Sequence, residues 1–348
     1  MKLVTPRFWY VRKGAPAPLI RTLLRPASWL WAGATARRIA RGRPLDPGVP
    51  VVCVGNLTMG GSGKTPVARA LAAHIAGRGL AVRILTRGYG GRLPGPLRVD
   101  PERHDARLVG DEALMLATEA PVIVARDRAA GAAAAVADGA RVIVMDDGHQ
   151  NPCVKKTLSL VVVDGETRDG EWPFGDGAVF PAGPMREPLA AGLARADAVV
   201  VLLPVDAPAV SPALLALFAG KPTLIARLAP VSAPPAGPLL AFAGIGKPWK
   251  MERALEAAGA RLADFAPLPD HLAYDEGLLR ALARRAEALG ASLLTSEKDY
   301  VRLPRIWRDR VAAWPVAARF EDLAALDALL DRTLSVSRDP PEPAKPKV

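Results

Sequence analysis

A glycine-rich loop joins an apolar strand to a helix in the stretch VVCVGNLTMGGSGKTPVARAL, residues 51–71. Glycines let backbone N–H groups converge on phosphate oxygens, and the N-terminus of the following helix adds a partial positive charge. Lys64 would reach the outer phosphates of a nucleotide, and the Thr65 hydroxyl would ligate Mg²⁺. Thr58 stands where the strict P-loop pattern has a glycine, and we expect Gly60 and Gly61 to supply the flexibility that it lacks. The predicted nucleotide-binding residues are Thr58, Met59, Gly60, Gly61, Ser62, Gly63, Lys64, Thr65 and Pro66.

A pair of carboxylates follows a second apolar run in the stretch RVIVMDDGHQ. Asp146 and Asp147 come at the end of this run, and parallel sheets bind their ligands at the carboxyl ends of their strands. In P-loop enzymes the second acidic motif lies near the Mg²⁺ ion that accompanies the nucleotide. The two motifs together predict a site for a nucleotide and Mg²⁺.

Phosphoryl transfer to an alcohol also needs a group that accepts the hydroxyl proton. The candidates are Asp111 and Glu112 in VGDEALML, and Asp270 and His271 in PLPDHLAY. Each signal is weak by itself, because carboxylates at a helix start are commonly caps or dipole partners.

Short runs of Val and Ile alternate with helical stretches from residue 49 onward. Runs without polar alternation are typical of a parallel sheet that is covered on both faces, and right-handed crossovers then produce a doubly wound α/β domain. The expected strands cover residues 51–54, 81–86, 121–125, 141–145, 158–163 and 198–203, and the main helices cover 65–78 and 128–138.

The domain organisation that we expect has five parts. A P-loop kinase core spans residues 49–226, a proline-rich linker spans 227–240, and a smaller α/β lobe spans 241–336, with helices at 249–258 and 275–289. The tail, residues 337–348, has the composition of a disordered segment. The first part, residues 1–48, is a basic amphipathic helical segment.

This N-terminal segment carries most of the net charge of +11, since residues 1–43 contain ten of the 46 Lys and Arg residues and no Asp or Glu. It also holds three of the seven tryptophans, and its apolar residues recur at helical spacing with a break near Pro26. Its longest uncharged run, residues 26–36, is far shorter than the ~20 residues that span a bilayer. Basic and aromatic residues on a short helix suit a membrane interface. The alternative is a helix that packs on the body and leaves a basic face in solvent.

Several classes of protein fit the composition poorly. A hydrophobic content of 50% excludes a disordered chain, and two cysteines are too few for a disulfide framework, which fits a reducing cytosol. Charge confined to one segment argues against nucleic acid as a partner. The tripeptide at residues 34–36 mimics a signal-peptide cleavage site, but a nucleotide site follows it directly, so we expect no export.

The motifs taken together resemble the tetraacyldisaccharide 4′-kinase family, the lipid A 4′-kinases of Gram-negative bacteria. VGNLTMGGSGKTP, LTRGYGG, GDEALML, ARDR, DDGHQ, FPAGPMREPL, FAGIGKP, PDH and TSEKD occur in the family's order, across residues 5–300. The resemblance implies transfer of the ATP γ-phosphate to the 4′-hydroxyl of a tetraacylated glucosamine disaccharide 1-phosphate. It also implies that the N-terminal segment brings the enzyme to this lipid at the cytoplasmic face of the inner membrane.

The resemblance also implies roles for particular residues. Asp111 matches the carboxylate that activates the sugar hydroxyl, and His271 matches its partner from the second lobe, although the reverse assignment is open. The metal-side residues would be Thr65, Glu112, Asp146 and Asp147, with Lys64 on the phosphates, and the substrate-side residues would be Arg87, Arg186 and Glu187. The chain departs from the family at His149 and Asn151, where the pattern often has phenylalanine and histidine, so we assign His149 no catalytic role.

Other functions use parts of the same pattern. A membrane-associated GTPase switch would need an N-K-x-D motif, which the chain lacks in TSEKDY. A non-enzymatic nucleotide-binding scaffold would not need both GDE and PDH, and a nucleic-acid kinase would not confine its basic charge to one segment. A measurement of whether ATP turnover depends on an acylated disaccharide distinguishes these functions from the kinase.

Overall fold

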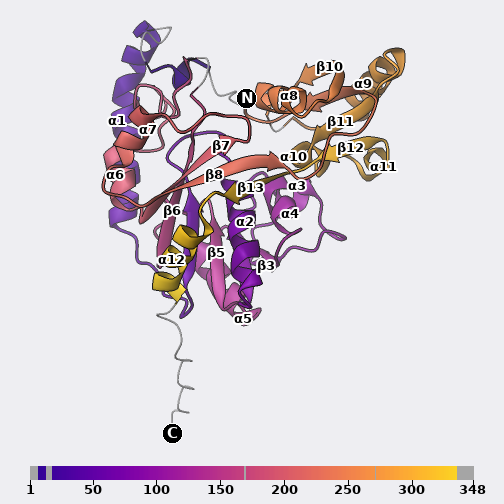
Figure 1. Ribbon diagram of the computed structural model, residues 1–348. Helices are drawn as coiled ribbons and strands as arrows, with labels where there is room; N and C mark the ends of the chain where they lie inside the picture. Colours follow the sequence, from indigo (N-terminus) through magenta and orange to yellow (C-terminus); the bar gives the residue numbers. More distant parts are fainter. Residues whose placement is uncertain (1–6, 13–17, 168–169, 271, 335–348) are drawn as a thin grey trace.

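A nine-stranded sheet forms the larger of two lobes (Figure 1). The computed structural model of the chain describes residues 7–12, 18–167, 170–270 and 272–334. The strand order is β13-β8-β7-β6-β1-β5-β2-β4-β3, parallel throughout except for the antiparallel edge strands β13 and β3. The predicted α/β, mostly parallel fold is confirmed. The strands are β1 Val51–Gly55, β2 Val82–Thr86, β3 Leu97–Arg98, β4 Val122–Val124, β5 Val142–Asp146, β6 Leu158–Asp164, β7 Ala198–Pro204, β8 Thr223–Pro230 and β13 Val316–Phe320.

Helices cover both faces of this sheet because its central strands are apolar on both. On β1, Val52 and Val54 pack against α2 and α12, whereas Val51 and Cys53 face the alanines of α5. A third apolar cluster packs α6 and α7 against β6 and β7. The helices are α2 Lys64–Gly77, α3 Ala106–Val109, α4 Asp111–Leu116, α5 Arg128–Ala137, α6 Leu189–Ala194, α7 Pro212–Leu215 and α12 Leu323–Leu334, and the 3₁₀ turns are η1 Arg7–Tyr10 and η3 Ala216–Phe218.

The smaller lobe is a four-stranded parallel sheet of order β10-β9-β11-β12. One face packs against α9 and the other against α8. Its strands are β9 Pro238–Ala243, β10 Arg261–Pro267, β11 Ser292–Ser296 and β12 Val311–Trp314, and its helices are α8 Pro248–Ala257, α9 Glu276–Ala288, α10 Glu297–Tyr300 and α11 Arg305–Arg308.

The chain returns to the larger lobe after β12, which corrects the expected boundaries. Strand β13 pairs antiparallel with β8, and the buried Leu326 and Leu330 of α12 join the core around α2. The smaller lobe therefore does not extend to residue 336. The expected linker 227–240 is also too long, because β8 continues to Pro230 and β9 begins at Pro238. The predicted tail, residues 337–348, lies outside the described residues.

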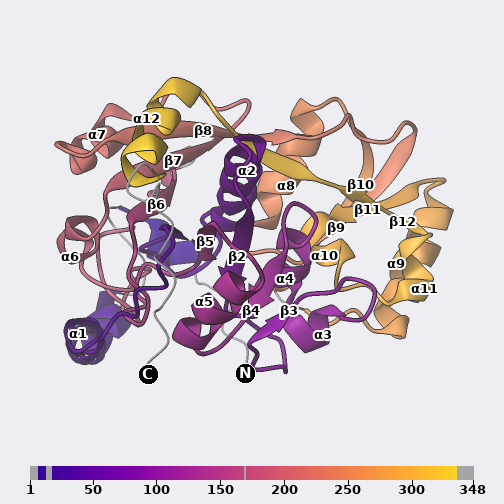
Figure 2. The ribbon, with the colours of Figure 1, turned by 90° about the horizontal axis from the view of Figure 1, so that it is seen from below.

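Helix α1, Pro18–Ala40, lies on the side of the large sheet opposite the smaller lobe (Figures 1 and 2). The helix runs through Pro26 without the predicted break. Contacts on both sides of the proline hold it, since Arg21 Nε donates to the Ala182 carbonyl at 3.2 Å and Ser28 Oγ accepts the Ala182 N–H at 3.1 Å. In the described part of the chain, every helix is too short or too polar to cross a membrane.

Candidate active site

The glycine-rich loop connects β1 to α2 at the carboxyl edge of the large sheet. Gly60 and Gly63 have φ angles of 94° and 77°, which glycine adopts at little cost. Thr58 is not in this left-handed region. Its carbonyl accepts from Asn56 Nδ2 at 2.9 Å and Arg186 Nε at 3.0 Å, and its backbone bridges to Met185. Thr58 is therefore held by its neighbours in a conformation that does not require glycine.

Helix α2 begins at Lys64 with Gly63 as its N-cap. Pro66 lies in the first turn, where its missing N–H would have no partner within the helix. The backbone N–H groups of a first helical turn have no partner within the helix, so they are available to a phosphate. The buried Ser62 Oγ has no hydrogen-bond partner among the described residues.

The two carboxylates after β5 differ in environment. Asp147 is the one non-glycine residue in the described part of the chain with a positive φ, 51°. Its carboxylate lies 2.7 Å from Arg186 Nη1 and 3.7 Å from Lys64 Nζ. Burial would raise the pKa of Asp147, but the charges of Lys64 and Arg186 outweigh it and hold the pKa well below its ordinary value. Asp147 is thus ionised and held beside Lys64.

Asp146 is fully buried, and burial together with the nearby Glu112 and Asp147 carboxylates raises its pKa to about 7. Its Oδ1 atom has no hydrogen-bond partner among the described residues. A cation would relieve both the repulsion and the unsatisfied oxygen, so these carboxylates fit Mg²⁺. No cluster of three or more ligating side chains occurs in the described residues. Mg²⁺ does not need one, because it takes most of its ligands from water and substrate phosphates.

The MREP segment, residues 185–188, contains two of the predicted site residues, Arg186 and Glu187. Arg186 donates to the Asp147 carboxylate, to the Thr58 carbonyl and, at 3.4 Å, to Gln150 Oε1. Glu187 is buried, accepts from Gln150 Nε2 at 2.9 Å and pairs with Arg195 at 2.6 Å. Two of the three predicted substrate-side residues, Arg186 and Glu187, are therefore engaged in contacts within the protein.

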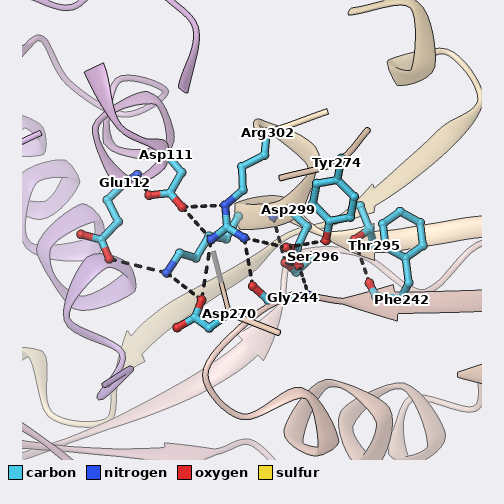
Figure 3. A network of polar contacts seen from close by, with 11 residues as sticks. Asp111, Glu112, Phe242, Gly244, Asp270, Tyr274, Thr295, Ser296, Asp299 and Arg302 are labelled. Carbon is cyan, nitrogen blue, oxygen red and sulfur yellow. Dashed lines mark hydrogen bonds and ion pairs between the residues drawn. The ribbon is translucent and has the colours of Figure 1, made fainter. Parts of the chain in front are cut away.

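Asp111 is buried at the first position of α4. Its Oδ1 accepts the Glu112 backbone N–H at 2.8 Å, and its Oδ2 accepts from Arg302 Nε at 2.6 Å (Figure 3). Arg302 belongs to the smaller lobe and was not predicted. Burial works against its charge, but Asp111 and Asp299 keep the pKa of the guanidinium above its ordinary value. His271, the predicted partner of Asp111, lies outside the described residues.

The smaller lobe meets the phosphate loop at the FAGIGKP segment. A Cβ on Gly246 would lie 3.5 Å from the Gly61 nitrogen and 3.6 Å from Asp270 Oδ2. Lys298 Nζ lies 3.8 Å from Glu112 and 3.6 Å from Asp270, so it stands between carboxylates of the two lobes. The geometry thus brings Glu112 of GDE and Asp270 of PDH to one place.

Two arginines come from other motifs, and of these Arg128 interacts with the acidic pair. Arg87 follows β2 and is exposed. Arg128 in ARDR is buried, and its burial lowers the pKa of the guanidinium to about 10, against the opposing charges of Asp146 and Asp147. No role was predicted for Arg128, although the motif that contains it was recognised.

His149 is part of the core. Its Nε2 lies 2.9 Å from the Gly192 carbonyl, which can only accept, so Nε2 carries the proton and Nδ1 accepts from Ser159 Oγ at 2.9 Å. Burial lowers its pKa to about 4, which keeps it neutral. These contacts give His149 a structural role.

A mostly apolar cavity of about 210 Å³ adjoins the phosphate loop. Its walls come from residues 61–63, from the ends of β7 and β8, and from Lys250 and Ala254 of α8. It therefore lies between the two lobes.

Comparison with known proteins identifies the family. A family model described as tetraacyldisaccharide-1-P 4′-kinase matches residues 20–335. Tetraacyldisaccharide 4′-kinase of Phenylobacterium zucineum is 66% identical over 330 residues, 95% of this chain and 99% of that protein. The protein of the same name from Caulobacter vibrioides is 64% identical, over 95% of this chain and 98% of its own. A crystal structure of LpxK from Aquifex aeolicus in complex with ATP is similar with a TM-score of 0.70 and 25% identity, over 90% of this chain and 99% of that chain. The resemblance indicated by the motifs is confirmed, and the chain belongs to the tetraacyldisaccharide 4′-kinase family.

Proposed function

We propose which residues carry out each part of the reaction of this chain. The chain is an ATP-dependent kinase that phosphorylates the 4′-hydroxyl of a tetraacylated disaccharide 1-phosphate in lipid A biosynthesis. The phosphate loop holds the nucleotide, the carboxylates after β5 hold the metal, and Asp111 receives the acceptor proton. The observation that carries this proposal is the convergence of all three at one edge of the large sheet, beneath the smaller lobe.

The nucleotide phosphates are bound by the loop from Thr58 to Pro66, with Lys64 on the outer phosphates. Lys64 Nζ lies 3.7 Å from Asp147, which orients the ammonium before the nucleotide arrives. The adenine ring fits the apolar cavity beside residues 61–63, because that cavity continues from the loop toward α8. Closure of α8 over the ring would then bring the smaller lobe to the phosphates.

Mg²⁺ would be held by Thr65, Asp146, Asp147 and Glu112, and it would neutralise charge that develops on the transferred phosphoryl group. The unsatisfied Asp146 Oδ1 supports this assignment. Asp147 is fixed by Arg186, so it presents its carboxylate without rearrangement.

Asp111 takes the proton of the 4′-hydroxyl, and His271 orients it from the smaller lobe. Proton removal comes late in a loose phosphoryl transition state, so a weakly basic carboxylate is adequate if it is well aligned. Of the three predicted substrate contacts, Arg87 is exposed and can meet the anionic acceptor. Arg186 is engaged with Asp147, and Glu187 is engaged with Arg195.

The acceptor is a lipid, and α1 provides the surface that meets its membrane. The buried side of α1 carries Ser28 and Thr35, whereas its exposed side carries an apolar stripe. An exposed apolar face next to basic residues fits an anionic bilayer surface, and the site of ATP makes this the cytoplasmic face of the inner membrane. The stripe consists of Leu19, Ile20, Leu23, Ala27, Leu30 and Ala34.

The assignment is tested by transfer of ³²P from ATP to the purified lipid acceptor. Asp111→Asn should lower kcat by roughly 10²–10⁴-fold, the usual contribution of a positioned acid or base, with ATP affinity little changed. Asp105→Asn is the matched control, because Asp105 caps the adjacent α3 and asparagine caps a helix equally well. Near-normal transfer by Asp111→Asn would refute its role as the base.

A further inference from the structure

A short segment of the smaller lobe makes polar contacts with the side chains of Asp111 and Glu112. It comprises residues 297–302, which form α10 and the turn after it. Glu297 pairs with Arg69 of α2 at 2.6 Å, Lys298 lies near Glu112, and Arg302 binds Asp111 (Figure 3). The segment begins within the motif TSEKD, residues 295–299, for which the proposed mechanism has no use.

Arg302 approaches a single oxygen of Asp111 with two nitrogens. Nε donates a hydrogen bond to Oδ2 at 2.6 Å, and Oδ1 accepts the Glu112 N–H. Nη2 also lies 2.6 Å from Oδ2, at ion-pair distance but without hydrogen-bond geometry, and 3.8 Å from Asp270 Oδ1. Each carboxylate oxygen is thus held from a different direction, which restricts rotation of the group. The contact joins residues 191 positions apart in the chain, and both side chains are buried.

Arg302 is itself held by a rigid support. Its Nη1 donates to the Gly244 carbonyl at 2.9 Å and to Asp299 Oδ1 at 3.0 Å. Asp299 is fully buried and accepts from the Tyr274 hydroxyl at 2.8 Å and the Ser296 hydroxyl at 2.6 Å. A flexible surface arginine would gain little from such a pair, but one with this much support is pre-organised.

We propose that Arg302 is a positioning residue for the phosphoryl-transfer step: it fixes the orientation of the Asp111 carboxylate toward the acceptor hydroxyl from the smaller lobe. The proposal rests on the proposed function, in which Asp111 receives the proton. A displacement of about 1 Å at a reacting group can cost roughly 10²-fold in rate, so an orienting contact of this kind affects turnover without touching the substrate. The planar shape of the Arg302 guanidinium matters as well as its charge. A lysine has a single side-chain nitrogen, so it cannot approach one carboxylate oxygen with two fixed nitrogens.

A simpler account treats Arg302 as one of several clamps between the lobes. The Arg69–Glu297 pair provides the comparison, because it joins the same segment to α2 but touches neither Asp111 nor Glu112. If clamping is all that Arg302 does, loss of either arginine should have the same effect.

The test compares Arg302→Met, Arg302→Lys and Arg69→Met in the full-length enzyme with ATP and the lipid acceptor. We expect Arg302→Met to lower kcat by roughly 10²-fold, with KM for ATP changed by no more than about twofold. Arg302→Lys should recover part of the loss, and Arg69→Met should retain near-normal kcat. Circular dichroism melting of each variant establishes that it is folded.

A double variant separates positioning from structure. In the Asp111→Asn background, Arg302→Met should cost little further activity, because the group that it positions no longer accepts a proton. An equal loss in both backgrounds, a normal kcat for Arg302→Met, or equal losses for Arg302→Met and Arg69→Met would each overturn the inference.

Two outcomes distinguish failure of the inference from failure of the proposed function. If Asp111→Asn is inactive and Arg302→Met is fully active, the role of Asp111 as the base stands and only the positioning role of Arg302 is refuted. Normal activity of Asp111→Asn overturns both. If Arg302→Met does not fold, Arg302→Lys decides alone, since full activity with the charge kept and the planar guanidinium lost would contradict the proposal.

Discussion

Gly63 shows how one residue of the phosphate loop meets two separate demands. Its φ of 77° is left-handed, and a Cβ at this position would clash with the Leu202 side chain. Left-handed backbone costs an ordinary residue about 1–2 kcal/mol, and overpacking typically adds about 1–3 kcal/mol. Gly63→Ala should therefore lower the melting temperature of the nucleotide-free enzyme markedly.

Gly61→Ala is the matched control for this prediction. Gly61 has no positive φ, and a Cβ there would meet no atom within 4 Å. Its melting temperature without nucleotide should stay close to that of the unmodified enzyme. Similar melting of the two variants would contradict the conformational role that we give to Gly63.

The residues of the site differ in how visible they are in the sequence. The place of Lys64 and Thr65 at the start of a helix after a glycine-rich loop could be predicted, because the loop and the helix are contiguous in the chain. Arg302 could not, because its partner Asp111 is brought to it only when the smaller lobe folds against the larger one. Glu187 was recognised as polar and near the site, but its burial against Arg195 depends on contacts that no local pattern reveals.

At the scale of elements, the apolar strands and the amphipathic helices could be predicted from their periodicity, whereas the placement of β13 and α12 could not. Strand β13 follows β12 closely in the chain but pairs with β8, and its side chains alternate only weakly in burial. Helix α12 then packs Leu326 and Leu330 onto the core around α2. Sequence order suggested that β13 and α12 belong to the smaller lobe. Strand β13 instead pairs with the edge of β8, which places both elements in the larger lobe.

The packing of α12 leads to a stability prediction. Leu330 is fully buried in the larger lobe, so Leu330→Ala should reduce the free energy of unfolding by about 2–5 kcal/mol, the usual range for such a truncation. Leu323 lies in the same helix but is 52% exposed, so Leu323→Ala should change it by much less. Urea unfolding followed by circular dichroism measures both. A small effect of Leu330→Ala would show that α12 adds little to the core.

At the scale of the whole molecule, α1 is connected to Asp147, one of the proposed metal ligands, through one loop. Trp31 Nε1 donates to the Arg186 carbonyl at 3.1 Å, and its ring lies 4.8 Å from that of Phe180. The Arg186 side chain in turn holds Asp147. Deleting residues 1–43 would therefore disturb the site as well as any membrane contact, and substitutions on the outer face of α1 test membrane binding more cleanly.

Leu23 and Leu30 are the residues for that test, because they are 80% and 76% exposed on the apolar stripe and make no part of the packing against the body. Burial of one leucine in an apolar environment contributes about 1.5–3 kcal/mol, so the double variant Leu23→Glu/Leu30→Glu should bind anionic vesicles at least roughly 100-fold more weakly. Transfer to acceptor embedded in vesicles should fall with it, while melting temperature and ATP binding stay near normal.

Ile306→Glu is the control, since Ile306 is 71% exposed on α11 of the smaller lobe, away from α1. High salt should weaken the binding that remains, because screening acts on the contribution of Arg37 and Arg38 and not on apolar burial. Undiminished flotation of the double variant with vesicles would mean that the apolar stripe of α1 does not hold this kinase at its membrane.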